Sequence, residues 1–149
     1  MPIEVRALGA GDAALLARVA DDVFDDPLDP AATRAFLADP CHHLVVALDA
    51  GLVVGFASAV RYVHPDKPRP ELWINEVGVA PSHQRRGVGR AIVAELLAVA
   101  RREGCGAAWV LTEAGNVAAR GLYAAAGGRA PDETTVLYAF ALDDAGEAR

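Results

Sequence analysis

Hydrophobic and polar positions along the chain change their period several times, and each change marks an expected element. Residues 3–8 alternate apolar and polar side chains, which is typical of a β-strand. Residues 13–24 repeat apolar side chains at helical spacing, which predicts a first helix with Asp12 as its N-cap. A shorter second helix is predicted to begin at Pro30, behind Asp29 as its N-cap.

The middle of the chain is expected to form strands. Two β-rich runs flank the residues DAG, which predicts a hairpin with its turn at Asp49 to Gly51. After a proline-bearing loop, the run ELWINEVGVAP predicts a third strand in this region. Gly78 inside that run indicates either a β-bulge or a backbone that another group approaches closely.

From Gly87 the apolar period becomes helical, and it predicts a helix to about Glu103. Three further elements are expected: a short strand AAWVLT, a helix NVAARGLYAAAG that stops at Gly127, and a closing strand TTVLYAFAL. The resulting order, βααβββαβαβ, predicts an α/β fold with a mixed sheet and helices on both faces. We expect a single domain with its core at about residues 3–142.

Composition and charge narrow the possible functions. The chain is 53% hydrophobic and 23% charged, as in a globular domain, and no apolar run approaches the roughly 18 residues that a membrane helix needs. The N-terminus lacks the pattern of a signal peptide, so a cytoplasmic location is expected. The net charge of -6 disfavours nucleic acid and favours a cationic small partner. Cys41 and Cys105 lack metal-ligand spacing, so no metal site is predicted.

One basic, glycine-rich stretch, QRRGVG at residues 84–89, stands out in this acidic chain because it lies where a strand passes into a helix. Glycines there let phosphate oxygens reach backbone N–H groups at the positive end of a helix. Arg85, Arg86 and Arg90 would add charge-assisted hydrogen bonds. The stretch lacks both familiar nucleotide-binding patterns, G-x-G-x-x-G and G-x-x-x-x-G-K-[ST]. A solvated turn is the alternative interpretation.

The segment VGVAPSHQRRGVGRAIVAELL resembles the acetyl-coenzyme A site of the GNAT N-acetyltransferases, whose signature is Q/R-x-x-G-x-G/A after a strand with a bulge. The segment NVAARGLYAAAG is similar to a second family pattern, N-x-x-A-x-x-L-Y-x-x-x-G, but Gly128 stands where the family usually has an aromatic residue. The resemblance implies acetyl-CoA as cofactor and a V-shaped cleft between two strands. The cofactor-binding residues that it implies are Val77, Val79, Gln84, Arg85, Arg86, Gly87, Val88, Gly89, Arg90, Asn116 and Tyr123.

Transfer of an acetyl group from a thioester to an amine needs a base for the ammonium and an acid for the departing thiolate. The resemblance implies that Tyr123 is the acid. For the base we predict Glu76, a carboxylate in an otherwise apolar strand, while an exposed glutamate or a buried ion pair is the alternative interpretation. His64 and Glu113 are further candidates for the base or for acceptor binding.

The acceptor is predicted from two features. The arrangement around RYVHPDKPRPELWINEVGVAP looks most like the type I aminoglycoside 3-N-acetyltransferases, which implies an aminoglycoside antibiotic as the amine. The connector DDVFDDPLD, Asp21 to Asp29, holds five carboxylates that would attract a polycation, with Asp25 and Asp26 as the predicted contacts. A solvated acidic loop is the alternative.

Other functions remain open within the same family. The acceptor could instead be a protein N-terminus, a lysine, a polyamine or a small amine metabolite, and a non-catalytic acyl-CoA binding module is a third reading. The resemblance also allows a homodimer that pairs through the C-terminal strand.

Overall fold

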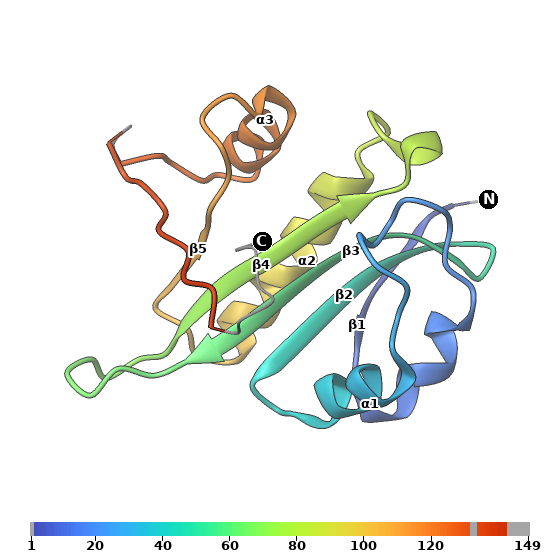
Figure 1. The fold of residues 1–149 in the computed structure, drawn as a ribbon, viewed down its shortest axis with the longest axis horizontal. Coiled ribbons are helices and arrows are strands. Elements are labelled where there is room, and N and C mark those ends of the chain that lie inside the picture. The colour runs from blue at the N-terminus through green and yellow to red at the C-terminus, as the bar shows by residue number, and fades with distance from the viewer. Residues whose placement is uncertain (1, 132–133, 143–149) are drawn as a thin grey trace.

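The structure, a computed structural model, describes residues 2–131 and 134–142 (Figure 1). Five strands form one sheet in the order β1-β2-β3-β4-β5, in which β4 and β5 are parallel and the other neighbours are antiparallel. The strands are β1 (Glu4–Leu8), β2 (His42–Asp49), β3 (Leu52–Tyr62), β4 (Glu71–Val79) and β5 (Ala107–Val110). The predicted α/β class with a mixed sheet is confirmed.

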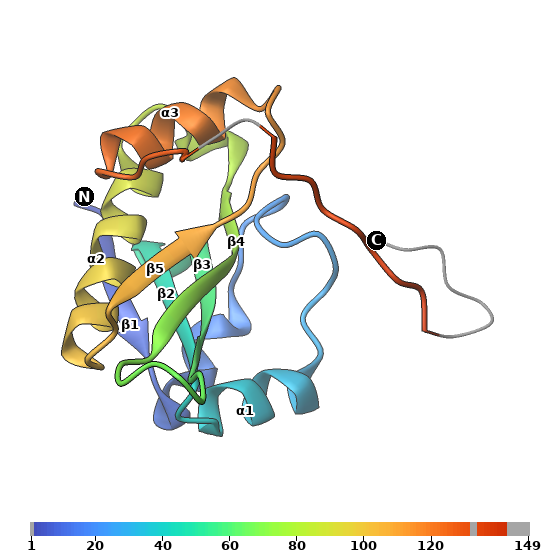
Figure 2. The ribbon, with the colours of Figure 1, turned by 90° about the vertical axis from the view of Figure 1, so that its left-hand side faces the viewer.

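Helices lie on both sides of this sheet (Figures 1 and 2). The long helix α2 (Val88–Arg102) contacts all five strands on one face. On the opposite face, α1 (Pro30–Ala38) packs on β2 and on the 3-10 helix η1 (Ala10–Ala17). The last helix, α3 (Val117–Ala125), contacts α2.

The core lies mainly between the sheet and α2. Its largest fully buried side chains are Leu72, Ile92, Leu96, Val45, Val46, Val53 and Val54. Gly55 lets α2 approach β3 closely, because a Cβ atom at this position would lie 2.8 Å from Cδ1 of Ile92. Each large apolar side chain buried in this way contributes about 1.5–3 kcal/mol to folding. No helix among the described residues is long and apolar enough to span a bilayer.

Three elements that were predicted from neighbouring residues are present in the structure: the β2–β3 turn, the start of α1 and the end of α2. In the β2–β3 turn, Ala50 and Gly51 have φ angles of 48° and 80°, as a type I′ turn requires. The Asp29 carboxylate accepts a 2.8 Å hydrogen bond from the backbone N–H of Ala32, and Pro30 opens α1. The helix predicted to reach about Glu103 ends at Arg102 with Glu103 as its C-cap.

The predicted helix at residues 13–24 is wrong. The structure has the 3-10 helix η1 (Ala10–Ala17) instead, and the Asp12 carboxylate accepts a hydrogen bond from the N–H of Gly9 rather than capping a helix that follows. Val19 forms a parallel bridge with Val53, and hydrogen bonds of 2.8 and 2.9 Å join Val53 to the residues on either side of Val19. The apolar spacing therefore reflects a segment laid against β3.

The predicted closing strand at residues 134–142 is also wrong, because this segment pairs with no strand among the described residues. Its large side chains are 69–95% exposed: Val136, Leu137, Tyr138, Phe140 and Leu142. The chain leaves α3 through Gly127, whose φ is 96°, and through a 2.9 Å hydrogen bond from Gly128 N–H to the Tyr123 carbonyl. It then runs away from the sheet (Figure 2). An apolar run of this kind does not form a strand without a partner strand.

Candidate functional site

The strands β4 and β5 diverge at one end of the sheet (Figure 2). Their parallel pairing begins at Glu71 with Ala107 and stops at Ile74 with Val110, whereas β4 continues to Val79. Between Ile74 and Val79, the β5 side of β4 has no partner strand among the described residues. This divergence is the V-shaped opening implied by the resemblance, and it leaves the predicted cofactor contacts at Val77 and Val79 on a strand edge that can accept a further extended chain.

A β-bulge sits before this open stretch. Residues Ser58 and Ala59 pair with Glu76 and Ile74, so Asn75 is the extra residue of the bulge. Two explanations for Gly78 were open from the sequence, a bulge or a close approach by another group. The structure shows the close approach, because a Cβ atom at Gly78 would lie 2.5 Å from the Val23 carbonyl oxygen. The bulge thus changes the phase of β4 immediately before Glu76.

The basic loop turns between β4 and α2 as predicted. The Gln84 side chain donates a 3.1 Å hydrogen bond to the Val79 carbonyl, and Arg85 and Gly87 adopt left-handed φ angles of 60° and 78°. A Cβ atom at Gly87 would meet nothing within 4 Å, so the backbone before Val88 is open to a ligand. The first-turn N–H groups of a helix have no intrahelical acceptor and attract anions.

The three arginines that flank this loop, Arg85, Arg86 and Arg90, have exposed side chains. None of them forms an ion pair with any residue in the described part of the chain. His83 anchors the start of the loop through a 2.8 Å hydrogen bond between its Nε2 and Asp49 Oδ2. This hydrogen bond lowers the pKa of Asp49. Open backbone donors and unpaired guanidinium groups together fit the phosphates of coenzyme A.

The helix α3 packs beside the loop. Asn116 caps it by accepting a 3.0 Å hydrogen bond from the N–H of Ala119. The Leu122 side chain would lie 3.4 Å from a Cβ atom at Gly89, so α3 rests on the first turn of α2. Burial raises the pKa of the neighbouring Tyr123, and its hydroxyl therefore keeps its proton in neutral solution.

A cavity of about 560 Å³ opens on the sheet face opposite α2. It is lined by Leu16, Phe24, Asp25, Asp26, Pro27, Leu28, Asp29, Ala32, Thr33, Phe36, Leu44, Phe56, Ser58 and Glu76. The structure thus brings the proposed base Glu76 together with the acidic connector residues Asp25 and Asp26. The rings of Phe24 and Phe56 stack with centroids 4.0 Å apart and form part of the apolar wall.

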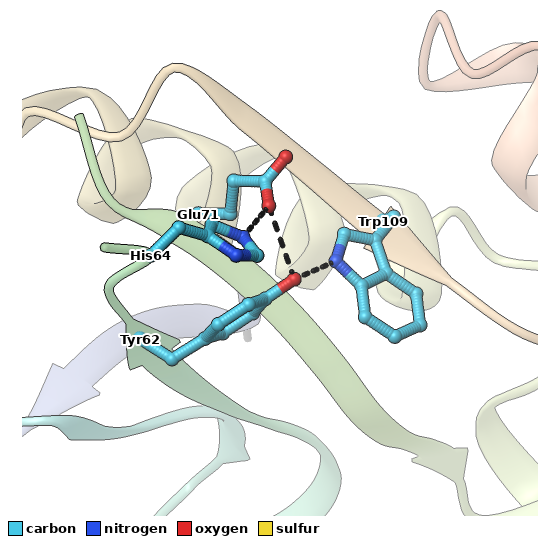
Figure 3. Close-up of polar contacts among 4 residues, drawn as sticks. All are labelled: Tyr62, His64, Glu71 and Trp109. Atoms are coloured by element: carbon cyan, nitrogen blue, oxygen red, sulfur yellow. Dashed lines mark hydrogen bonds and ion pairs between the residues drawn. The ribbon is translucent and has the colours of Figure 1, made fainter. Parts of the chain in front are cut away.

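The two other candidates from the sequence, His64 and Glu113, lie outside this cavity lining. His64 bonds to the Glu71 carboxylate, which also accepts a hydrogen bond from Tyr62 (Figure 3). Glu113 is exposed in the turn before α3, where its carbonyl accepts a 3.0 Å hydrogen bond from the N–H of Asn116. Sequence reasoning did not identify the apolar wall, although Gly78 opposite Phe56 signalled the close packing there.

Comparisons with known proteins agree with this geometry. Residues 14–127 match the Acetyltransferase (GNAT) family. The chain is 36% identical over 128 residues to N-alpha-acetyltransferase RimI of Mycobacterium tuberculosis, covering 85% of this chain and 78% of that protein. Its fold is similar to that of an aminoglycoside acetyltransferase from an uncultured soil metagenomic sample, with a TM-score of 0.81, 17% identity, and coverage of 95% of this chain and 97% of that one.

A second solved structure, the ribosomal-protein-alanine N-acetyltransferase from Brucella melitensis biovar Abortus 2308, matches with a TM-score of 0.69 at 18% identity, covering 92% of this chain and 99% of that one. At these identities the two structures establish the fold alone. The family match and the relative at 36% identity, together with the diverging strands and the loop at the start of α2, carry the assignment. The chain belongs to the GNAT acetyltransferase family and is an N-acetyltransferase that uses acetyl-CoA.

Proposed function

We propose that this enzyme acetylates the α-amino group at the N-terminus of a polypeptide. The observation that carries the proposal is the mixed lining of the cavity, in which carboxylates such as Asp25 and Glu76 face apolar side chains such as Phe24 and Phe56. A polypeptide N-terminus carries one ammonium group, which suits the carboxylates, next to a side chain that can pack against the apolar wall. The similarity to an N-alpha-acetyltransferase supports the same acceptor.

A polycationic antibiotic fits this lining less well. Its several ammonium groups would meet apolar walls, and removing charged groups from water without partners is costly. Aminoglycoside 3-N-acetylation is nevertheless the second candidate, because Asp25, Asp26 and Asp29 line the cavity and would attract a polycation. That attraction would weaken as salt is added.

Acetyl-CoA supplies the acetyl group as a thioester when it is bound. The residues of this chain that would hold it are the backbone at Gly87, Val88 and Gly89, assisted by the exposed arginines of the loop, and the free edge of β4 at Val77 and Val79. The residues present suit this group because the loop combines an accessible helix N-terminus with unpaired guanidinium groups.

In the proposed chemistry, Glu76 accepts a proton from the acceptor ammonium, directly or through water, so that the amine nitrogen regains a lone pair. The Tyr123 hydroxyl holds the proton that the departing thiolate takes up. Burial raises the pKa of this hydroxyl, which is protonated at neutral pH and so carries a proton to transfer.

The test is an acetyl-CoA consumption assay over a panel of amines. The two test peptides share one sequence without lysine and differ only in the N-terminus, which is free in one and blocked in the other. We expect turnover with the free peptide and none with the blocked peptide. Mass spectrometry of the product would locate the acetyl group on the α-nitrogen. Turnover with gentamicin-type aminoglycosides and none with any peptide would overturn the proposal and establish the second candidate.

A further inference from the structure

A group of aromatic side chains lies exposed on the sheet outside the cavity. Trp73 on β4 and Trp109 on β5 stack with their ring centroids 5.0 Å apart and their planes 8° from parallel. They remain 38% and 36% exposed. Tyr62 on β3 packs its ring edge-on to Trp109 (Figure 3). We call Tyr62, Trp73 and Trp109 the aromatic surface.

Hydrogen bonds link two residues of the aromatic surface, Tyr62 and Trp109, to each other and to Glu71 (Figure 3). The indole N–H of Trp109 donates to the Tyr62 hydroxyl, which in turn donates to Glu71 Oε2 at 3.3 Å. The Nε2 atom of His64 bonds to the same carboxylate oxygen. The hydrogen bond from His64 lowers the pKa of Glu71, so a negative charge borders the surface at neutral pH. Ordered groups lose less conformational entropy when a ligand binds them.

The sheet register places the aromatic surface on the face that carries Glu76. Gly55 faces α2, since a Cβ atom there would touch Ile92, whereas Phe56 lines the cavity. Side chains alternate along a strand, so every second residue of β3 after Phe56 points to the cavity face, and Tyr62 is one of them. The residues paired with these on β4 and β5 share that face.

Those pairs are Ser58 with Glu76, Val60 with Trp73, Tyr62 with Glu71, and then Trp73 with Trp109. Residues three positions apart on a regular strand point to opposite faces. The extra residue Asn75 in the bulge puts Glu76 on the same face as Trp73. At about 3.3 Å per residue, Trp73 lies within about 10 Å of Glu76 along β4. The acidic connector and α1 lie over β2 and β3 on this face (Figures 1 and 2), while Trp73 on β4 and Trp109 on β5 remain partly exposed.

We propose that the aromatic surface binds the acceptor polypeptide beyond its reactive amine, so that residues about three to five of the acceptor lie over Trp73 and Trp109, with a basic side chain at Glu71. The inference rests on the proposed polypeptide acceptor and names the part of it that the enzyme recognises. Two features select this occupant. The aromatic surface continues the cavity face along β4, and Glu71 provides a charge complementary to lysine or arginine.

The kinetic test compares two acceptors that share their N-terminal residues, a dipeptide and an octapeptide with lysine at position four. In Trp109→Ala, kcat/KM for the octapeptide is expected to fall about ten-fold, as for a central aromatic contact. The dipeptide kcat/KM and the KM for acetyl-CoA stay unchanged. Val63→Ala, which removes an exposed apolar side chain outside the aromatic surface, is the matched control and leaves both acceptors unaffected. Glu71→Gln abolishes the preference for lysine over norleucine at position four.

A binding test needs no turnover. The chain has two tryptophans, and both belong to the aromatic surface, so intrinsic fluorescence reports on it directly. Titration of the wild-type enzyme with the N-acetylated octapeptide is expected to change the emission in a saturable way, whereas the N-acetylated dipeptide does not. This measurement remains informative if an alanine variant does not fold.

Several results would overturn the inference. Equal losses for the dipeptide and the octapeptide in Trp109→Ala would indicate a structural role, and an absent fluorescence response would exclude binding. A wild-type enzyme that is a dimer, and that Trp109→Ala converts to an active monomer, would assign the surface to a second copy of this chain. If no peptide is acetylated, the proposed function itself fails. If peptides are acetylated without any length preference, only this inference fails.

Discussion

Replacing Gly78 by alanine is expected to destabilise the protein and to weaken acceptor binding selectively. The added Cβ atom would lie 2.5 Å from the Val23 carbonyl oxygen and 2.8 Å from Cε1 of Phe56. Neither neighbour yields easily, because the first is backbone and the second is a ring stacked on Phe24 at 4.0 Å. The connector that carries Val23 and Phe24 must therefore move away from β4.

Overpacking of this kind costs about 1–3 kcal/mol. For a chain of 149 residues, each kcal/mol lowers the melting temperature by about 2–4 °C, so a decrease of about 2–12 °C is expected. Because Phe24 and Phe56 line the cavity proposed to bind the acceptor, the KM for the acceptor should rise. The KM for acetyl-CoA should rise less than the KM for the acceptor, since the atoms nearest to the added methyl group belong to Val23 and Phe56.

The assay is thermal unfolding followed by circular dichroism, combined with steady-state kinetics in which each substrate is varied. Gly121→Ala is the matched control, because a Cβ atom there meets nothing within 4 Å and the residue lies inside α3. Inside a helix, replacing glycine by alanine raises the free energy of unfolding by up to about 1 kcal/mol. The control should therefore melt at or above the wild-type temperature. A Gly78→Ala protein with the melting temperature and acceptor KM of the wild type would refute the reasoning.

Four further predictions concern separate parts of the molecule. Tyr123→Phe should lower kcat about 100-fold in steady-state assays, far more than it changes the KM for acetyl-CoA, and an unchanged kcat would exclude the tyrosine as the acid. Asp25→Asn should raise the acceptor KM at low salt and flatten its salt dependence; identical salt curves for variant and wild type would contradict a role for this charge. The pKa of Asp49 is lowered in the folded state by His83, so its stabilising effect is present above its unfolded pKa of about 3.8 and is lost as the pH falls through the still lower folded value. Melting curves between pH 5 and pH 2 should therefore fall less steeply for Asp49→Asn than for the wild type, and parallel curves would argue against the hydrogen bond. Phe140→Ser should leave the melting temperature within about 2 °C of the wild type, because the ring is 81% exposed; a larger decrease, or a change of elution volume in gel filtration, would show that the C-terminal segment is buried in a homodimer.

The sequence by itself determined the features that depend on neighbouring residues. The N-caps at Asp29 and Asn116, the turn at Ala50 and Gly51, and the helix behind the basic loop were all predictable because each is stabilised by groups a few residues apart. The basic loop at residues 84–89 belongs to this class, which is why the resemblance to the acetyltransferase family was recognisable from two short motifs.

Only the tertiary structure decided the features that depend on distant partners. The apolar spacing at residues 13–24 suits a helix, but hydrogen bonds to Val53 on β3 hold the segment at Val19 against the sheet. The apolar run at residues 134–142 suits a strand, yet a strand needs a neighbour that its own residues do not supply. The extra residue of the bulge, Asn75, is visible only in the pairing of β3 with β4.

The proposed acceptor site shows the same division. The sequence by itself identified Glu76, a carboxylate in an otherwise apolar strand, and the acidic connector, which holds five carboxylates. Their meeting in one cavity with an apolar wall, and the alignment of Trp73 and Trp109 on the same sheet face, follow from strand register and from the fold of the connector. Register is set by the sum of contacts across the sheet, so no local pattern in the chain encodes it.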